Sequence, residues 1–401
     1  MRFIGFLVVL LLITALAWTI VGAQVHAEVP GGWSTIGLTW ALSVIPVFIL
    51  VRNLSSGRHP SAATRLFLFR PFWYSQLLML ALALLSSAAF IVGLPFGTAA
   101  AGGRWAVIVG AAALLAVGVW GYVGSRRLVV KQVVLRPPRL PAALDGLKIV
   151  QLTDLHVGPQ TSQGHMRRVA DATRAAGADI IAYTGDQVDD HPGDIDVFAA
   201  AFGALTAPLG VYAIPGNHDV YAGWSEVRRR TEAIGIRVLV NEAIALRRNG
   251  TPFYLAGTGD PAATQLGQRG GPAPDIPRTL AHVPHGAFCV ALAHNPALFP
   301  ALAGRVDVVL SGHTHHGQLS IPSKNWSLAS VFLEYAMGTY ERDGSLLYVS
   351  PGTNFWGIPF RIGALPEVTV VTLAAAPTAS ASLGPDALPG DEQTWRRTPH
   401  S

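Results

Sequence analysis

The stretch Gly312-His313-Thr314-His315-His316-Gly317-Gln318 directly follows an apolar run, Val306-Asp307-Val308-Val309-Leu310. A short apolar run of this kind predicts a buried strand, so the seven residues after it form a strand-to-loop turn. His313 and His315, two residues apart on such a turn, can project into one cavity. A polar, His-rich loop would explain these seven residues alone, so their interpretation depends on the rest of the chain.

Polar side chains of the same kinds follow four earlier apolar runs. Strands that alternate with helical segments predict a layered α/β fold. The carboxyl ends of strands are also where open α/β sheets place their functional sites. The side chains are Asp154 and His156 after residues 147–152, Asp186 after 178–183, Asn217, His218 and Asp219 after 210–214, and His294 after 287–293. Helices are expected at 165–176, 195–205 and 224–234, and further strands at 236–240, 244–248, 253–256, 346–349 and 367–373.

With His218 and Asp219 set aside, these strand ends supply two Asp, one Asn and four His as candidate metal ligands, and no thiolate. That mixture suits Mn²⁺, Fe or Zn²⁺ better than Cu(I) or an iron–sulfur cluster. One metal needs about four ligands, so seven candidates predict two metals that share a bridging carboxylate. Such a pair lowers the pKa of a bridging water, which could attack phosphorus. His218 could stabilise the developing charge or protonate the leaving oxygen, with Asp219 fixing its tautomer.

The ordered set resembles the calcineurin-like metallophosphoesterases, whose pattern is D-x-H, G-D, G-N-H-[DE], a lone His and G-H-x-H. It is most similar to a bacterial membrane-associated branch whose last motif reads GHTHGGQ, and the short motifs 351–354 and 359–361 also resemble that branch. The resemblance covers residues 147–373 and implies a four-layer β-sandwich flanked by helices, rather than a plain doubly wound sheet.

The resemblance also implies roles for individual residues. Asp186 would bridge the two metals, and His218 would face the substrate phosphate without binding a metal, oriented by Asp219. His316 departs from the branch, which usually has Gly there, and a bulkier side chain beside the metal pocket puts substrate access in question. The first metal would be held by Asp154, His156, Asp186 and His315, and Asn217, His294 and His313 would complete the second.

Residues 1–125 differ from the rest in composition. The whole chain is 50% hydrophobic and only 13% charged, with a net charge of +5. Pro46, within one apolar stretch, is tolerable in a lipid-embedded helix. A cleaved signal peptide is the alternative for the first stretch, but its apolar run is long and three more follow. Four uncharged stretches have about the length of a membrane-spanning helix: residues 3–23, 33–51, 71–97 and 105–124.

The positions of Lys and Arg predict the orientation of these spans. The loop after the first span has no Lys or Arg, and the loop after the third has only Arg104. The segments after the second and fourth spans are basic, which predicts that both ends lie in the cytoplasm. These basic residues are Arg52, Arg58, Arg65 and Arg70, and then Arg126, Arg127, Lys131, Arg136 and Arg139. We therefore expect a multi-pass inner-membrane protein with a cytoplasmic catalytic domain.

The expected organisation has four parts: a membrane anchor at 1–125, a basic linker at 126–146, the metallophosphoesterase domain at 147–373, and a disordered tail at 374–401, rich in Ala, Pro, Ser and Thr. A single cysteine, Cys289, excludes an internal disulfide. No dense basic stripe with interleaved aromatics follows residue 140, so no nucleic acid partner is expected.

The sequence thus predicts a membrane-anchored, metal-dependent phosphodiesterase or phosphomonoesterase. The tether and the basic segment 126–139 would hold the site near anionic headgroups, which favours a phospholipid or a lipid-linked pyrophosphate as substrate. One alternative is a non-catalytic membrane scaffold with the same fold, although such a protein should have lost ligands. Another is a transporter or receptor with a regulatory hydrolase domain, which the absence of charged residues from the four spans disfavours.

Overall fold

The computed structural model describes residues 2–56, 64–158, 160–189, 191–265, 271 and 273–376. The chain divides into two compact units, Met1–Trp120 and Gly121–Ser401. Most of the tail expected to be disordered, from residue 377 onward, lies outside the described residues.

The first unit is helical. Among the described residues, four segments are long and apolar enough to cross a membrane: Val8–Val25, Gly32–Ile49, Phe67–Phe96 and Ala99–Arg126. They match the four expected spans. The second is broken at Val44, because Pro46 lacks an N–H and its ring clashes with the carbonyl four residues earlier. The helices are α1 (Arg2–Val25), α2 (Gly32–Ser43), α3 (Ile45–Ser56), α5 (Arg70–Gly93) and α6 (Ala99–Arg126), whose last residues belong to the second unit.

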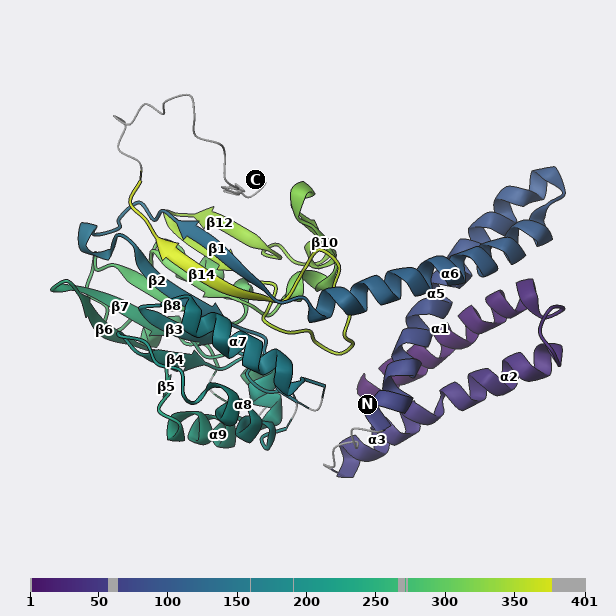
Figure 1. The fold of residues 1–401 in the computed structure, drawn as a ribbon, viewed down its shortest axis with the longest axis horizontal. Helices are drawn as coiled ribbons and strands as arrows, with labels where there is room; N and C mark the ends of the chain where they lie inside the picture. The colour runs from purple at the N-terminus through teal and green to yellow at the C-terminus, as the bar shows by residue number, and fades with distance from the viewer. Residues whose placement is uncertain are drawn as a thin grey trace. The chain divides into compact units, whose positions relative to one another are not determined.

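The second unit contains two six-stranded sheets (Figure 1). Each is mostly parallel, with β14 antiparallel to β2 in the first and antiparallel pairs at both edges of the second. The first sheet has the order β1 (Val129–Leu135), β14 (Glu367–Leu373), β2 (Leu147–Leu152), β3 (Ile180–Thr184), β4 (Val211–Ile214) and β5 (Arg237–Val238). The second has the order β12 (Gly338–Arg342), β13 (Ser345–Val349), β9 (Val308–Ser311), β8 (Cys289–Leu292), β7 (Thr251–Gly257) and β6 (Glu242–Arg248). A small hairpin joins β10 (Ser320–Ile321) to β11 (Trp326–Ser327).

The sheets and helices form the expected four layers. Side chains alternate along each strand, so Ile149 packs between the two sheets while Val150 packs against the helices of the first sheet. In α7, Met166, Val169 and Thr173 recur on one buried face, as an amphipathic helix requires. The covering helices are α7 (Gln163–Ala175), α8 (Asp194–Phe202) and α9 (Asn217–Ala233) on the first sheet, with α10 (Ala262–Gln265), α11 (Ile276–Thr279) and α12 (Phe299–Leu302) after β7 and β8. Short 3₁₀ turns are η3 (Ala142–Leu144), η5 (Pro296–Leu298), η6 (His315–Gln318), η7 (Pro322–Lys324) and η8 (Leu328–Val331).

Two segments differ from the sequence expectations. The stretch 126–146, expected to be a linker, contains β1, because Val129–Leu135 pairs with β14 and buries Val133 and Leu135. The helix expected to begin at Trp224 begins at Asn217 instead. The carboxylate of Asp219 accepts the Gly216 N–H and caps a first turn, and Gly223, at φ 108°, bends the helix between that turn and the rest.

Candidate metal centre

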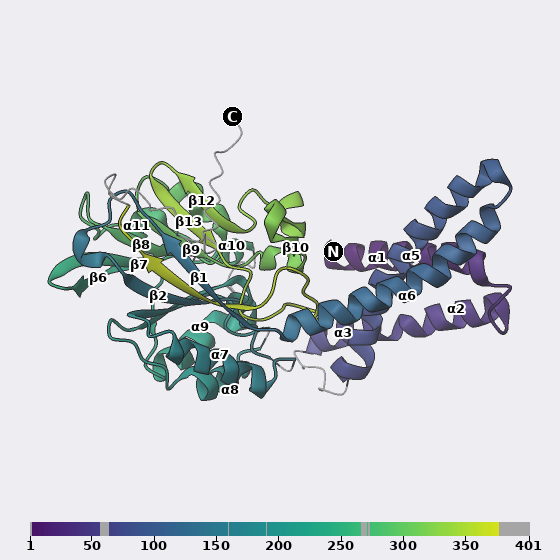
Figure 2. The same ribbon diagram turned by 45° about the horizontal axis from the view of Figure 1, so that its top comes forward.

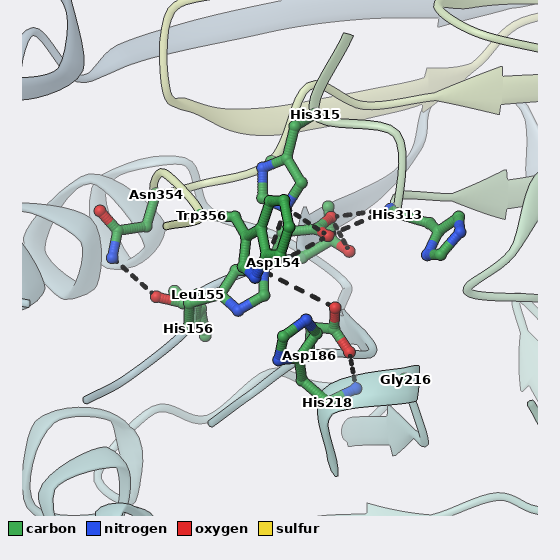
Figure 3. A network of polar contacts seen from close by, with 12 residues as sticks. Asp154, Leu155, His156, Asp186, Gly216, His218, His313, His315, Asn354 and Trp356 are labelled. Atoms are coloured by element: carbon green, nitrogen blue, oxygen red, sulfur yellow. Dashed lines mark hydrogen bonds and ion pairs between the residues drawn. The ribbon is translucent and has the colours of Figure 1, made fainter. Parts of the chain in front are cut away.

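Two groups of buried side chains meet at the carboxyl ends of the strands. Asp154, His156 and His315 place ligand atoms within 4.8 Å of one another, and so do Asp154, Asp186 and His294. Figure 3 shows Asp154, His156, Asp186 and His315 pointing toward a common centre. The structure therefore brings together residues that lie up to 161 positions apart in the chain (154 to 315).

The first group has its nitrogen and oxygen atoms turned inward. His156 Nε2 lies 3.0 Å from His315 Nε2, and His315 Nε2 lies 3.3 Å from Asp154 Oδ1. The Asp154 carboxylate is held by its neighbour Thr153, whose hydroxyl donates to Oδ2 at 2.8 Å, and by the His313 N–H at 3.0 Å.

Asn217, the first residue of α9, adds an amide oxygen to the second group. Its Oδ1 lies 3.1 Å from His294 Nε2 and 2.8 Å from His313 Nδ1. His294 Nδ1 donates to the carbonyl of Thr184 at 2.8 Å, since a carbonyl only accepts. Nε2 is therefore the inward-facing atom that could bind a metal. The hydrogen bond from Nδ1 to the backbone orients the ring, as in the ligand histidines of metal sites.

Asp186 belongs to the second group and also lies close to the first. Its Oδ2 is 3.6 Å from His156 Nε2 and 3.2 Å from His294 Nε2. Its Oδ1 accepts the His218 N–H at the N-terminus of α9, where the helix dipole favours a negative charge. Burial opposes ionisation, but the charges of His294 and His218 bring the pKa of Asp186 well below its usual value. Burial also acts on His294, yet the Asp186 charge raises the pKa of His294 well above its usual value.

The backbone at the site is strained. Five of the seven candidate ligands have left-handed φ angles: 52° at Asp154, 40° at His156, 53° at Asp186, 72° at His313 and 49° at His315. A non-glycine residue in this region costs roughly 1–3 kcal/mol and persists only where the surrounding structure enforces it. Sequence reasoning placed these residues at strand ends but had no signal for this conformation.

Two glycines allow the strands to approach closely. A Cβ on Gly312 would lie 2.1 Å from Thr153 Oγ1 and 2.2 Å from Asp154 Oδ2. A Cβ on Gly216 would lie 2.2 Å from Asp186 Oδ1. The glycines of the G-H-x-H and G-N-H motifs are therefore required because a side chain would displace the carboxylates.

The donor set fits divalent cations. Two carboxylates, inward-facing imidazole nitrogens and an amide oxygen crowd into a buried space, where the two negative charges need a cation or a proton. Arg361 Nη2 lies 2.7 Å from His315 Nδ1. A guanidinium only donates, so this contact places the imidazole hydrogen of His315 on Nε2, facing His156. A cation bound at Nε2 would take the place of that hydrogen.

His218 lies beside the first group but contacts a different carboxylate from the one expected. Its Nδ1 donates to the backbone carbonyl of Asp189 at 2.8 Å and lies 3.7 Å from Asp189 Oδ1. Asp189 Oδ1 is also 3.3 Å from His156 Nδ1. Sequence reasoning missed Asp189, and the available signal was its position three residues after Asp186 in the same loop.

Asp219, expected to orient His218, instead accepts backbone N–H groups. The donors are Gly216 and Gln187 at 2.9 Å and Val188 at 3.2 Å. Burial and the nearby Asp186 charge raise the pKa of Asp219 to about 7. Asp219 therefore ties the loop after β3 to the start of α9.

His316 points away from the candidate ligands. Its Nε2 donates to the carbonyl of Val349 at 3.0 Å, so the ring connects the loop to the end of β13. Burial lowers the pKa of His316 to about 3, and the ring is neutral near pH 7. This contact gives no support to the expectation that the His316 side chain hinders substrate access to the metal pocket.

Arg361 is a second residue whose position the sequence did not predict. Its side chain is fully buried, and its guanidinium donates to the carbonyls of Pro351, Asn354 and Ala364. Burial lowers the pKa of Arg361 to about 9, so the side chain is charged at neutral pH. The short motif 359–361 was noted in the sequence, but nothing in it shows that the cation lies against His315.

Known proteins resemble part of this chain. Residues 147–317 match the family model described as calcineurin-like phosphoesterase. A "Transmembrane protein with metallophosphoesterase domain" from Danio rerio is 33% identical over 249 residues, which cover 59% of this chain and 55% of that protein. An "Uncharacterized metallophosphoesterase" from Aquifex aeolicus is 29% identical over 257 residues, which cover 64% of this chain and 95% of that protein. The chain thus spans about half the length of the zebrafish relative.

Among solved structures, a 5′-nucleotidase precursor from Thermus thermophilus is 18% identical over 51% of this chain and 49% of its own, with a TM-score of 0.36. A similarity this weak supports no statement about the roles or positions of individual side chains.

Proposed function

We propose that this chain, whose residues 147–317 match the calcineurin-like phosphoesterase family model, is a membrane-anchored hydrolase of phosphate ester or pyrophosphate bonds that uses two divalent metals. The observation that carries the proposal is the position of Asp186. One carboxylate oxygen lies 3.6 Å from His156 Nε2, in the first group, and 3.2 Å from His294 Nε2, in the second. A single carboxylate that reaches both groups is the arrangement that a dinuclear site requires.

The residues would divide between two cations, of which Mn²⁺, Fe and Zn²⁺ suit the donor set. When bound, the cations supply Lewis-acid stabilisation of phosphoryl charge and lower the pKa of bound water. Asp186 would serve both cations. Asp154, His156 and His315 would complete the first set, and Asn217, His294 and His313 the second.

His218 would act on the substrate. Its Nδ1 hydrogen is used by the Asp189 carbonyl, so Nε2 is the atom that would hold a proton for the leaving oxygen or donate to a phosphoryl oxygen. The Asp189 carboxylate, 3.7 Å from the ring, would stabilise the protonated form of His218. Trp356, with its ring centroid 6.0 Å from that of His218, would border the space for the substrate.

The test is hydrolysis by the purified full chain in lipid nanodiscs, with aryl phosphomonoester and phosphodiester substrates, together with analysis of bound metal. Asp186→Asn removes a charge that, at about 4 Å and an effective dielectric constant of about 20, interacts with a unit charge by roughly 4 kcal/mol. Metal affinity should fall about 1,000-fold or more, and activity should fall with it.

Asp196→Asn is the matched control, since Asp196 is an exposed carboxylate on α8. The proposal is wrong if wild type and Asp186→Asn are equally inactive with every metal and both substrates. A non-catalytic scaffold, the alternative, would purify without stoichiometric metal.

The orientation and the substrate are finer parts of the same proposal. The alternation of basic loops supports a cytoplasmic domain on the inner membrane. A reporter fused after residue 373 should then behave as cytoplasmic, and an active periplasmic alkaline phosphatase fusion would contradict this orientation.

The basic segment 126–139 supports a phospholipid or a lipid-linked pyrophosphate as substrate. Activity against a panel of lipid phosphates, with Asp186→Asn as the blank, would identify the substrate. Hydrolysis of soluble phosphate esters but of no lipid on the panel would exclude a lipid phosphate as the substrate.

A further inference from the structure

Beyond β1, the exposed apolar side chains of the second unit are concentrated in one segment and Trp356. Nine large apolar side chains are exposed among the described residues 136–376, and seven of them belong to residues 321–333 and Trp356. Phe332 is 80% exposed, Val331 59% and Trp356 51%. We call residues 321–333 together with Trp356 the apolar rim. Soluble surfaces seldom gather apolar side chains in this way unless the surface binds something.

The apolar rim borders the metal centre. A Cβ on Gly317, in the His-rich loop, would lie 2.7 Å from the Leu328 Cβ, and the Leu328 N–H donates to the Leu319 carbonyl at 2.8 Å. Gln318 holds Trp356 through two hydrogen bonds, donating to its carbonyl at 3.1 Å and accepting its N–H at 3.0 Å. Whatever covers the rim therefore lies next to the candidate catalytic residues.

The loop that carries Trp356 is also attached to the end of α6. The Arg361 N–H donates to the Gly121 carbonyl at 2.8 Å, and a Cβ on Gly124 would lie 2.0 Å from the Arg361 carbonyl oxygen. The Arg126 guanidinium lies 5.7 Å from the Phe355 ring centroid. Residues 121–126 are the last of the candidate span Ala99–Arg126. The loop is thus attached where that span would leave the hydrocarbon layer.

Figures 1 and 2 show the β10–β11 hairpin and the last turns of α6 at the same end of the second unit. Lys324 is the only charged residue among 321–333, Arg126 ends the span, and Arg127 and Lys131 come within five residues after it. Tryptophan and phenylalanine beside a few cations are typical of surfaces that enter the headgroup layer of an anionic membrane.

We propose that the apolar rim inserts into the headgroup layer of the same bilayer that holds α6, with anionic phospholipid as its occupant. The insertion follows from the position of the rim and does not require the hydrolase activity. Its consequence for substrate choice rests on the proposed function: the metal centre would open toward phosphates at the membrane surface.

Site-directed labelling of the full chain tests the insertion. Phe332→Cys carries an environment-sensitive NBD label on the rim, and Val197→Cys, from an exposed position on α8, is the control. Burial raises the pKa of the native Cys289 thiol to about 12, so it should label poorly. The proteins are placed in vesicles of phosphatidylcholine and phosphatidylglycerol, with and without spin-labelled lipid.

The expected result is strong quenching of the label at 332 by spin-labelled lipid and weak quenching by iodide, with the reverse at 197. Equal iodide quenching at both positions would overturn the proposal. A label at 332 that is shielded from iodide but not quenched by the lipid would also overturn it, since a second copy or another protein surface would then cover the rim.

A kinetic test separates the rim from the hydrolase chemistry. Phe332→Ser should lower turnover of a lipid phosphoester in vesicles about ten-fold, as the loss of one large buried apolar group implies, and leave turnover of a soluble aryl ester unchanged. Val197→Ser should change neither. An equal loss on both substrates would contradict the rim's role. If the wild type hydrolyses neither substrate, the proposed function fails, and the quenching experiment alone decides the insertion.

Discussion

Replacing Asp189 tests whether the carboxylate that the structure places beside two histidines supports the reaction. Its Oδ1 lies 3.3 Å from His156 Nδ1 and 3.7 Å from His218 Nδ1. Asp189 and a protonated His218, with unit charges 3.7 Å apart, interact by about 4.5 kcal/mol at an effective dielectric constant of about 20. The Asp189 side chain is 28% exposed, and water reduces this interaction by roughly half or more.

Asp189→Ala should therefore cost about 1.4–2.8 kcal/mol of transition-state stabilisation, roughly a 10–100-fold fall in kcat. The KM for a soluble substrate should change little, because Asp189 acts through its histidine neighbours and not on the substrate. Asp189→Asn keeps an acceptor oxygen and should fall between wild type and Asp189→Ala. The assay is steady-state hydrolysis at several pH values with saturating metal, alongside metal analysis.

Asp196→Ala is the control, because it removes a carboxylate that is 72% exposed on the neighbouring helix α8. If Asp189→Ala and Asp196→Ala both keep wild-type kcat and pH profile, the carboxylate does not act on either histidine. A loss of activity that excess metal fully restores would show that Asp189 supports only the His156 side of the site.

Three further changes test other parts of the structure. Arg361→Met leaves buried carbonyls without their donor and should lower the free energy of unfolding by about 3–5 kcal/mol, seen as a lower Tm in nanodiscs; an unchanged Tm would show that the guanidinium is not needed. His165, whose pKa burial lowers to about 4 from 6.5, is neutral when folded. The contribution of His165 to the free energy of unfolding is complete above about pH 6.5 and falls by up to about 1.4 kcal/mol per pH unit toward pH 4. The free energy of unfolding of His165→Gln, taken from denaturation curves, should therefore fall less on acidification than that of wild type. Gly312→Ala would push a Cβ into the Asp154 carboxylate and should abolish metal binding, measured by elemental analysis. Gly164→Ala in α7 is the control and should keep its metal, because a Cβ there has no atom nearer than 3.8 Å. Equal metal content in the two variants would refute the steric argument.

The layered fold and the membrane half were predictable because both depend on short-range patterns. A span of about 20 uncharged residues has to satisfy its backbone internally in lipid, so composition alone identified the four candidate spans. Buried strands followed by polar residues likewise identified the strand ends that carry Asp154, Asp186 and His294. The break between α2 and α3 was less visible, since Pro46 disrupts a helix by an amount that depends on its neighbours.

The partners of individual side chains were less predictable. Asp219 is adjacent to His218 in the sequence, which is why the sequence favoured it as the partner of the imidazole. In the structure the carboxylate beside that ring is Asp189. Asp219 lies in the first turn of α9, where unpaired N–H groups attract its carboxylate. The loop after β3 instead brings Asp189 to the imidazole.

The sequence by itself determined which donor atoms this protein has, the order in which they follow its strands, and which segments are apolar enough to enter a membrane. Those properties depend on residue type and local spacing. Only the tertiary structure decided that Arg361 lies against His315, that His316 binds the end of β13, and that Leu328 of the exposed segment 321–333 packs against the His-rich loop. These contacts join separate segments of the chain, and packing and left-handed backbone turns set them, which no local pattern encodes.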